Sequence, residues 1–289
     1  MFPRKAVGDG TPTIVVYATS TCSARVTALL ADDFSFELCL CKLSFSEQRL
    51  VCNNRHRVRA LVLRLFTKYV LNAAMHESRS VPAAFQPWAD LQYTSNEFGK
   101  PTLLGGPHFN ASSSNDVAAV VVQFNQNTPV GIDVSHELQD GISPTHFMSQ
   151  FEGIFLPEET AFLNSIDSLP QRYVGFNQLW TLKEAFSKFL GTGLNVDLAR
   201  ASFRCLRVVQ PSSSSELSWD HDIIVNTSQL APQLQKITRG GVRCALAVVK
   251  DGVVGRLPVI MSLVHQADIS DYYYIHIDMY PVLQAIVGV

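Results

Sequence analysis

The sequence predicts a protein of mixed α and β structure, built from about two structural units. At roughly 150 residues per domain, a chain of 289 residues corresponds to two domains. Short runs rich in Val and Ile predict strands, whereas apolar residues at steps of three and four predict helices. Both patterns recur along the chain, and no internal repeat of fixed period is visible, which disfavours solenoids and propellers.

The first part of the chain begins with a strand and continues into helices. Thr13–Tyr17 predicts the strand. Ser44 followed by Glu47 predicts a helix start with a reciprocal cap. Val58–Val70 carries apolar residues at steps of three and four, which predicts a helix with one buried face. Pro101–Pro107 is rich in Gly and Pro and predicts a loop.

A domain boundary is expected in the polar segment Asn125–Pro129, between two predicted strands, Val117–Val122 and Val130–Val134. We therefore expect an N-terminal half over residues 1–127 and a C-terminal half over residues 128–289. The C-terminal half should also contain a short helix opened by Leu156–Glu159, a long helix over Gly175–Leu190 that ends at glycines, and strands at Cys244–Val249, Val259–Val264 and Tyr272–Ile277.

Composition excludes several classes of protein. The formal net charge of -2 argues against a nucleic-acid-binding surface that covers the whole molecule. The longest apolar runs are only as long as a strand, and the first residues lack the apolar core of a signal peptide. The six cysteines lack the paired spacing of a zinc site. We expect a cytoplasmic protein that binds neither nucleic acid nor membrane.

A basic segment over residues 48–76 contains no Asp or Glu. A solvated helix face explains most charge runs of this kind. An anion site is the alternative, because Arg and Lys hold phosphates by bidentate or point-charge contacts. Both interpretations stay open at this level. The cations concerned are Arg49, Arg55, Arg57, Arg59, Arg64 and Lys68.

Two carboxylates with lysines nearby indicate chemistry at a phosphoanhydride. Asp133 lies in an apolar strand, where an unpaired carboxylate would be costly to bury. Glu184 precedes Lys188 by one helical turn, and Lys183 lies beside them. A turn-bonded Asp and an ordinary surface ion pair would explain each feature alone. Together they suit Mg²⁺, which favours few protein carboxylates and also binds substrate phosphates.

Four motifs in order and spacing resemble those of a known family. The most specific is Trp180–Lys188, with the pattern W-x-x-K-E-x-x-x-K. The others are Gly99–Pro101, Phe109–Ser114 and Gly131–Asp133. This set resembles the 4'-phosphopantetheinyl transferases, in particular the larger, pseudo-dimeric type that serves surfactin synthetase, fungal synthases and aminoadipate reductase. The resemblance extends over about half of the chain, from Arg49 to Leu194.

The resemblance implies an activity and roles for three residues. The activity is transfer of the phosphopantetheine arm of coenzyme A to a serine hydroxyl of an apo carrier protein, with release of adenosine 3',5'-bisphosphate. Asp133 and Glu184 would coordinate Mg²⁺ on the pyrophosphate. Glu184, directly or through a water, would also take the serine proton, and Lys188 would stabilise the phosphate charge or the leaving group.

The resemblance also implies contacts to coenzyme A. Arg59, by its place at the head of the basic helix, and Lys100 match the family's contacts less specifically than the metal ligands do. The other residues assigned to coenzyme A on this basis are Pro101, Asn110, Ser112, Ser113 and Lys183.

Two positions depart from the family pattern. Ser113 stands where the family has a histidine that contacts coenzyme A phosphate, and a hydroxyl donates a hydrogen bond but carries no positive charge. Ser135 stands where bacterial members have a third acid. These departures predict weaker coenzyme A binding or an altered pose, and a metal held by two protein carboxylates.

The same match implies an α+β fold with two similar halves. Each half would have a small antiparallel sheet and a long helix, with coenzyme A in a cleft between the halves. Residues 1–127 would contact the phosphates, and residues 128–289 would hold Mg²⁺ and the catalytic carboxylates. We expect a monomer that modifies an apo acyl or peptidyl carrier domain or an aminoadipate reductase.

Two alternatives remain open. A module of this fold that binds coenzyme A or a carrier but is catalytically impaired is favoured by Ser113 and disfavoured by Glu184 and Lys188. A different Mg²⁺-dependent nucleotide enzyme would depend on the basic helix alone, and the common phosphate-loop motifs are absent from the sequence.

Overall fold

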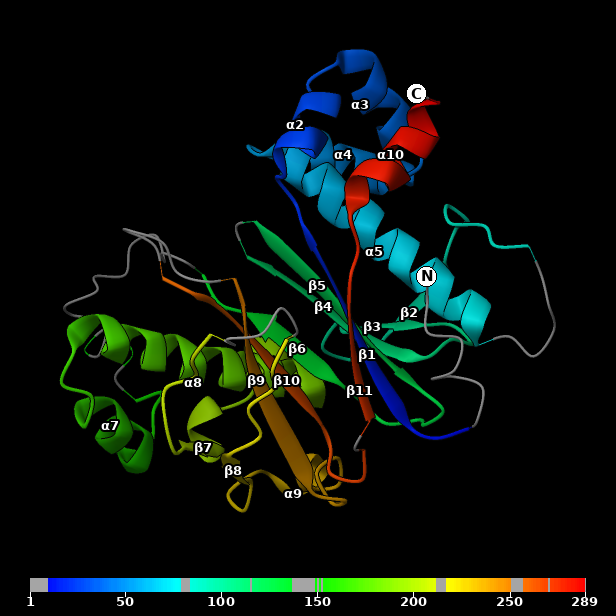
Figure 1. The fold of residues 1–289 in the computed structure, drawn as a ribbon. Helices are drawn as coiled ribbons and strands as arrows, with labels where there is room; N and C mark the ends of the chain where they lie inside the picture. The colour runs from blue at the N-terminus through cyan, green and yellow to red at the C-terminus, as the bar shows by residue number, and fades with distance from the viewer. Residues whose placement is uncertain are drawn as a thin grey trace. The chain divides into compact units, whose positions relative to one another are not determined.

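The computed structural model describes residues 10–78, 84–114, 116–136, 149, 151, 153–211, 217–250, 257–269 and 271–288. The architecture is mixed α+β (Figure 1), and the chain divides into two units. Unit 1 comprises Met1–Thr94, Thr102–Asn127 and Asp271–Val289, and unit 2 comprises Ser95–Pro101 and Thr128–Ser270. Among the described residues, every helix is too short or too polar to span a bilayer.

Unit 1 contains a four-stranded sheet. Its order is β11 (Asp271–His276), β1 (Thr13–Ser20), β5 (Val117–Phe124) and β4 (His108–Ser114). β1, β5 and β4 pair antiparallel, whereas β11 pairs in parallel with β1. The added strand satisfies backbone groups that β1 would otherwise leave unpaired at its edge. The chain thus returns to unit 1 after Asp271, a return that the expected boundary between halves did not include.

The long helix of unit 1, α5 (Arg57–Glu77), covers one face of this sheet, and the shorter helices pack on it and on one another (Figure 1). Apolar side chains of the long helix, among them Leu61, Leu65 and Phe66, form one core with Val120 and Val122 of β5. The predicted cap is confirmed, because the backbone N–H of Ser44 donates to Glu47 Oε2 (3.1 Å) and that of Glu47 donates to Ser44 Oγ (3.4 Å). The helices are α2 (Ala24–Leu29), α3 (Asp33–Leu40), α4 (Phe45–Cys52), α5 (Arg57–Glu77) and α10 (Met279–Val287).

A short hairpin replaces part of the loop predicted at Pro101–Pro107. It consists of β2 (Tyr93–Ser95) and β3 (Pro101–Leu103). Pro101 is the first residue of β3, a position where a strand tolerates the missing N–H group. The tip of the hairpin, Ser95–Pro101, belongs to unit 2.

Unit 2 contains a three-stranded antiparallel sheet in the order β6 (Gly131–Val134), β10 (Val259–Gln266) and β9 (Val242–Lys250). The long helix α8 (Leu169–Leu190) packs on β6 and β10. It starts earlier than predicted because a proline fits its first turn. The smaller elements are α7 (Pro157–Asn164), α9 (Pro232–Gln235), the 3-10 helices Gly193–Asn195 and Leu198–Arg200, and the strand pair β7 (Ser202–Cys205) and β8 (Ile223–Asn226).

The predicted buried face and end of α8 are confirmed. Leu182, Phe186 and Phe189 are at most 1% exposed and belong to the core of unit 2. Gly191 ends the helix with φ of 75°, a left-handed conformation that favours glycine, and the N–H groups of Gly191 and Thr192 bond back to the Ser187 carbonyl.

The two units share a chain topology. In each, a first strand is followed by a long helix and then by a pair of antiparallel strands, β4–β5 or β9–β10. The first strand pairs antiparallel with the second strand of that pair, as β1 with β5 and as β6 with β10. The sheets therefore have equivalent orders, β1-β5-β4 and β6-β10-β9, with β11 as an addition in unit 1.

Candidate functional site

Asp133 lies in a strand that contacts the backbone of α8. All four residues of β6 are buried. A Cβ atom at Gly131 would clash with the Ala185 carbonyl oxygen and lie 2.6 Å from the backbone nitrogen of Phe189. Glycine therefore allows the strand to approach the helix closely. Two residues further on, the same strand places Asp133 beside the last turns of α8.

Asp133 forms an ion pair with Lys188 of α8. Lys188 Nζ lies 2.6 Å from Asp133 Oδ1, and the two side chains are 25% and 12% exposed. A charged hydrogen bond of this length satisfies a carboxylate that β6 would otherwise bury at high cost. The pair also joins the two motifs that the sequence singled out separately.

Glu184 lies one helical turn before Lys188. Its pKa is raised above the ordinary value, first by burial and then by the negative charge of Asp133, while Lys188 lowers it. The influence of Asp133 on this pKa indicates that the two carboxylates share one electrostatic environment. The structure thus brings together Asp133, Glu184 and Lys188.

Two nearby carboxylates, of which Glu184 has a raised pKa, fit a divalent cation. A cation between them would remove their repulsion and offset the cost of burying Glu184 in its charged form. Among the described residues, no group of three or more His, Cys, Asp or Glu side chains is placed to hold a metal. A site with two carboxylates still suits Mg²⁺, which completes its shell with water and phosphate oxygens.

Lys183, which the resemblance assigned to coenzyme A, lies in the interior of unit 2. Its side chain and that of Glu159 are both 0% exposed, and Lys183 Nζ lies 2.9 Å from Glu159 Oε2. The ammonium also donates to the carbonyls of Leu198 (3.0 Å) and Ala201 (2.9 Å). Burial lowers the pKa of Lys183, opposed by Glu159. This lysine of the W-x-x-K-E motif therefore stabilises the interior of unit 2.

Ser135 extends the pairing of β6 with β10. Its N–H donates to the Ile260 carbonyl (2.8 Å), and its hydroxyl accepts from the Ile260 N–H (2.8 Å). The residue is 2% exposed. Ser135 stands where the resemblance places an acid in bacterial members of the family. Its hydroxyl binds backbone here, which agrees with a site of two carboxylates.

Lys100 points to the C-terminal end of α8. Its Nζ donates to the carbonyls of Lys188 (2.6 Å) and Val130 (3.1 Å). Burial lowers the pKa of Lys100 to about 8. The neighbouring Pro101 is exposed at the start of β3. In this arrangement the Lys100 ammonium binds protein carbonyls rather than presenting itself to a phosphate.

Three predicted coenzyme A contacts lie on β4 of unit 1. Ser113 is exposed, whereas Asn110 and Ser112 are half-buried. Because side chains alternate along a strand, Ser113 points to one face of the sheet, and Asn110 and Ser112 point to the other. A contact through Ser113 and contacts through the other two would therefore use different faces of this strand.

The basic helix is compensated by acids from other segments. Arg59 Nη2 lies 3.0 Å from Asp116 Oδ1, so the predicted coenzyme A contact is held in an ion pair. Further pairs with acids of other segments join Arg57 to Asp33 (3.6 Å), Arg64 to Glu47 (4.0 Å) and Lys68 to Asp90 (2.9 Å). The structure thus favours a solvated, paired face for much of this helix.

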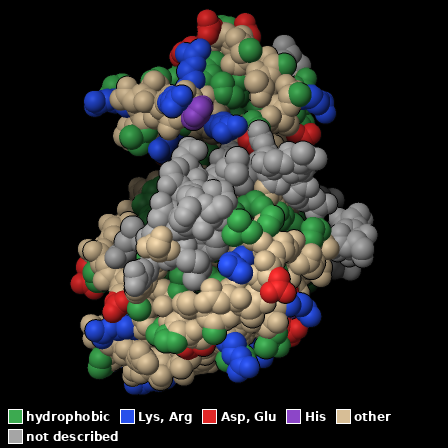
Figure 2. Space-filling view, turned by 90° about the vertical axis from the view of Figure 1, so that its left-hand side faces the viewer, with side chains coloured by type: hydrophobic (Ala, Val, Ile, Leu, Met, Phe, Trp, Pro, Cys, Tyr) green, Lys and Arg blue, Asp and Glu red, His purple; other side chains and the backbone are tan. Residues whose placement is uncertain are grey.

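Part of the basic surface stays exposed where α4 leads into α5. In Figure 2, Lys and Arg side chains gather around a His near the top of the view, in the helical part of unit 1. Arg49, Arg55 and His56 are exposed there. These residues are further candidates for an anion contact within the segment that lacks acids.

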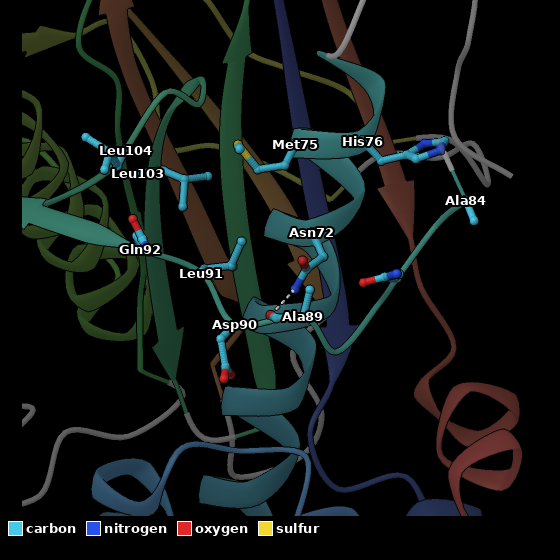
Figure 3. A pocket seen from close by; sticks show the side chains of 11 residues that line it. Asn72, Met75, His76, Ala84, Ala89, Asp90, Leu91, Gln92, Leu103 and Leu104 are labelled. Atoms are coloured by element: carbon cyan, nitrogen blue, oxygen red, sulfur yellow. Dashed lines mark hydrogen bonds between the residues drawn. The ribbon is translucent and has the colours of Figure 1, made fainter. Parts of the chain in front are cut away.

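A pocket of about 390 Å³ lies beside the C-terminal half of α5 (Figure 3). Apolar side chains such as Met75, Leu91 and Leu103 form much of its wall. Its Asn72 donates to the carbonyls of Lys68 (3.0 Å) and Ala89 (3.1 Å), which connects α5 to the segment before β2. None of the residues predicted for catalysis or coenzyme A binding lines this pocket.

Two polar residues near the site were not predicted from the sequence. Glu159 was recognised only as part of a helix start, and its partner Lys183 is far away in the sequence. Asn96 precedes Lys100 by four residues, and its Oδ1 accepts from the N–H groups of Phe98 (3.1 Å) and Lys100 (2.8 Å). An Asn shortly before Gly99 is a signal for such a turn.

Comparisons with known proteins match the same region. Residues 129–247, which contain Asp133, Glu184 and Lys188, match the family model of the 4'-phosphopantetheinyl transferase superfamily. An L-aminoadipate-semialdehyde dehydrogenase-phosphopantetheinyl transferase of Candida glabrata is 27% identical over 58% of this chain and 62% of its own length. The protein of that name from Eremothecium gossypii is 29% identical over 68% of this chain and 72% of its own length.

A bacterial relative supports the same assignment. The 4'-phosphopantetheinyl transferase gsp of Aneurinibacillus migulanus is 29% identical over 39% of this chain and 43% of its own length. Against the relatives from Candida glabrata and Saccharomyces cerevisiae, the match spans 62% of the relative's length. The resemblance seen in the motifs is confirmed: residues 129–247 match the superfamily model, and the chain is similar to several proteins named as phosphopantetheinyl transferases.

Proposed function

We propose that this protein transfers the 4'-phosphopantetheine arm of coenzyme A to a serine hydroxyl of an apo carrier protein. The serine oxygen forms a new bond to the phosphorus that carries the pantetheine arm. The bond from that phosphorus to the bridging oxygen breaks, and adenosine 3',5'-bisphosphate leaves. The observation that carries this proposal is the cluster of Asp133, Glu184 and Lys188 within the segment that matches the superfamily.

Asp133 and Glu184 are proposed as the ligands of Mg²⁺. Both are oxygen ligands, which Mg²⁺ prefers, and the negative charge of Asp133 contributes to the raised pKa of Glu184. When bound, Mg²⁺ would supply positive charge that offsets the charge of the pyrophosphate.

Glu184 and Lys188 are proposed to act on the proton and on the phosphate charge. A positioned carboxylate can accept a proton in the transition state, and Glu184, which lies one helical turn from Lys188, is proposed to take the serine proton directly or through a water. Lys188 holds Asp133 in the protein without ligands. With Asp133 bound to a divalent cation, the ammonium of Lys188 would be able to interact with the phosphate or with the leaving group.

Arg59, Asn110, Ser112 and Ser113 of unit 1 are proposed as contacts to coenzyme A. Arg59 is 42% exposed, so its ion pair with Asp116 leaves part of the guanidinium accessible. The proposal includes a pseudo-dimeric fold with coenzyme A in a cleft between the halves. The equivalent strand and helix order of the two units supports the pseudo-dimer part.

The relatives point to the class of carrier. Several are named L-aminoadipate-semialdehyde dehydrogenase-phosphopantetheinyl transferases, so we propose a carrier domain of an aminoadipate reductase, in lysine biosynthesis, as the first to test. Acyl and peptidyl carrier domains of fatty acid, polyketide and peptide synthesis are further candidates.

The test is a transfer assay with Mg²⁺ and a fluorescent coenzyme A analogue. The acceptors are an apo carrier domain of an aminoadipate reductase, an acyl carrier protein and a peptidyl carrier domain. Label on the carrier serine, lost when that serine is changed to alanine, supports the proposal. No transfer to any of the carriers contradicts it.

Ser113 motivates a second candidate, a protein that binds coenzyme A but transfers slowly. Ser113→His adds a side chain that can carry positive charge at a position that is exposed. We expect a several-fold tighter Kd for coenzyme A by calorimetry, because charged hydrogen bonds to phosphate are stronger than neutral ones. An unchanged or weaker affinity would show that Ser113 does not line the phosphate site.

A further inference from the structure

The tip of the β2–β3 hairpin is bonded to the C-terminal end of α8. Asn96 Nδ2 donates to the Gly191 carbonyl (2.7 Å), and Lys100 Nζ donates to the Lys188 carbonyl (2.6 Å). The last four carbonyls of a helix have no partner within it. Two side chains of the hairpin thus satisfy helix-end groups, and the positive charge of Lys100 suits the negative end of the helix dipole.

Lys100 also reaches the strand that carries Asp133. The same Nζ donates to the carbonyl of Val130, the residue directly before β6 (3.1 Å). One ammonium group therefore bridges the start of β6 and the last turn of α8. These are the two elements whose side chains form the Asp133–Lys188 pair.

Asn96 holds Lys100 in place. Its Oδ1 accepts from the Lys100 backbone N–H (2.8 Å) while its amide donates to α8. The glycine at the helix end makes room for both residues, since a Cβ at Gly191 would lie 2.7 Å from Asn96 Nδ2 and 3.2 Å from Lys100 Cδ.

We infer that Lys100, held by Asn96, is a positioning residue: by joining the start of β6 to the end of α8, it sets the position of Lys188 against Asp133. The inference deepens the proposed transfer and rests on it for its kinetic consequence. It replaces the direct coenzyme A contact that the motif implied for Lys100. Two carbonyls already accept hydrogen bonds from the ammonium, so at most one of its three N–H groups is left for another acceptor.

Kinetics with coenzyme A and with 3'-dephospho-coenzyme A distinguish a positioning role of Lys100 from a direct phosphate contact. For Lys100→Met we expect kcat to fall about tenfold to hundredfold, as for a displacement of the reacting groups, with the KM for coenzyme A within twofold of the parent. The preference for coenzyme A over 3'-dephospho-coenzyme A should stay unchanged. A KM that rises tenfold, or a lost preference for the 3'-phosphate, would overturn the inference in favour of a phosphate contact.

Asn96→Ala is a second variant that keeps the Lys100 charge. We expect kcat to fall by less than in Lys100→Met, because Lys100 keeps its charge and loses only the group that holds its backbone. Unchanged kcat in both variants would overturn the inference. Lys236→Met is the matched control, since it removes an exposed lysine of the same unit and should leave kcat unchanged.

A measurement without substrates keeps this test independent of the proposed activity. In ¹H–¹⁵N spectra of lysine ammonium groups, the Lys188 signal should be protected by its contact with Asp133. We expect this signal to broaden or disappear in Lys100→Met and to persist in Lys236→Met. A Lys188 signal that is unchanged in Lys100→Met would overturn the inference, whether or not any carrier is modified.

Discussion

The two units share a topology, but they differ in the side chains that lie between the first strand and the long helix. These side chains are apolar in unit 1 and include an ion pair in unit 2. In unit 1, the helix-facing residues of β1, Val15 and Tyr17, join an apolar core with Leu61 and Leu65 of α5. In unit 2, the equivalent strand carries Asp133, which pairs with Lys188 of α8. The same arrangement of strand and helix thus builds a core in one unit and a charged site in the other. In unit 2, the strand that carries Asp133 also approaches the backbone of α8 closely at Gly131.

The largest expected effect comes from removing either carboxylate of unit 2. Asp133→Asn and Glu184→Gln should each lower kcat of transfer by about 10²- to 10⁴-fold, the range for a lost general base or a lost electrostatic contact. Asp222→Asn, which changes an exposed carboxylate of the same unit, should leave kcat unchanged. Near-normal rates in either site variant, with circular dichroism showing an intact fold, would refute the roles of these carboxylates.

Two ion pairs that differ in burial provide a second contrast between the units. Lys183→Met leaves Glu159 charged and fully buried, so we expect a loss of about 3–5 kcal/mol in the free energy of unfolding. Lys68→Met in unit 1 leaves Asp90, which is 90% exposed and stays hydrated, so a loss of about 1 kcal/mol or less is expected. Urea unfolding measures both. Equal losses would show that burial of the partner does not decide the cost.

The close approach of β6 to α8 predicts a steric effect. Gly131→Ala should destabilise unit 2 by about 1–3 kcal/mol, because the added methyl group meets helix backbone that cannot move aside. Gly175→Ala is the matched control, since the atoms nearest to its added methyl group belong to the side chains of Ile166, Leu163 and Phe162, which can shift more easily than backbone. If thermal unfolding shows equal Tm values for both variants, Gly131 is not needed for the strand–helix contact.

The smallest effect concerns the Glu184 pKa in the protein without metal. Lys188 lowers this pKa and Asp133 raises it. Lys188→Met should therefore move it upward and Asp133→Asn downward, as followed by NMR titration of the carboxyl carbon. The native state holds this proton more tightly than the unfolded state, so Glu184 makes stability fall as pH rises from its ordinary pKa to the raised one. Glu184→Gln should remove that part of the pH dependence.

Local patterns were sufficient for several of the elements and for singling out the residues of the proposed chemistry. The helix start at Ser44, the buried face of α8 and the strands β1 and β6 follow from side-chain period and capping, which act within a few residues. Asp133, Glu184 and Lys188 were recognisable because motif spacing within one strand and one helix is preserved in the fold.

The sequence by itself determined which residue types carry the proposed chemistry, and only the tertiary structure decided which charges remain for a ligand. Lys183 looked equivalent to Lys188 on one helix, yet it faces Glu159 in the core while Lys188 faces Asp133. Lys100 and most of the basic helix are likewise held by groups distant in sequence. Burial and pairing depend on contacts between elements, and the energy of a charge depends on its surroundings far more than on its neighbours along the chain.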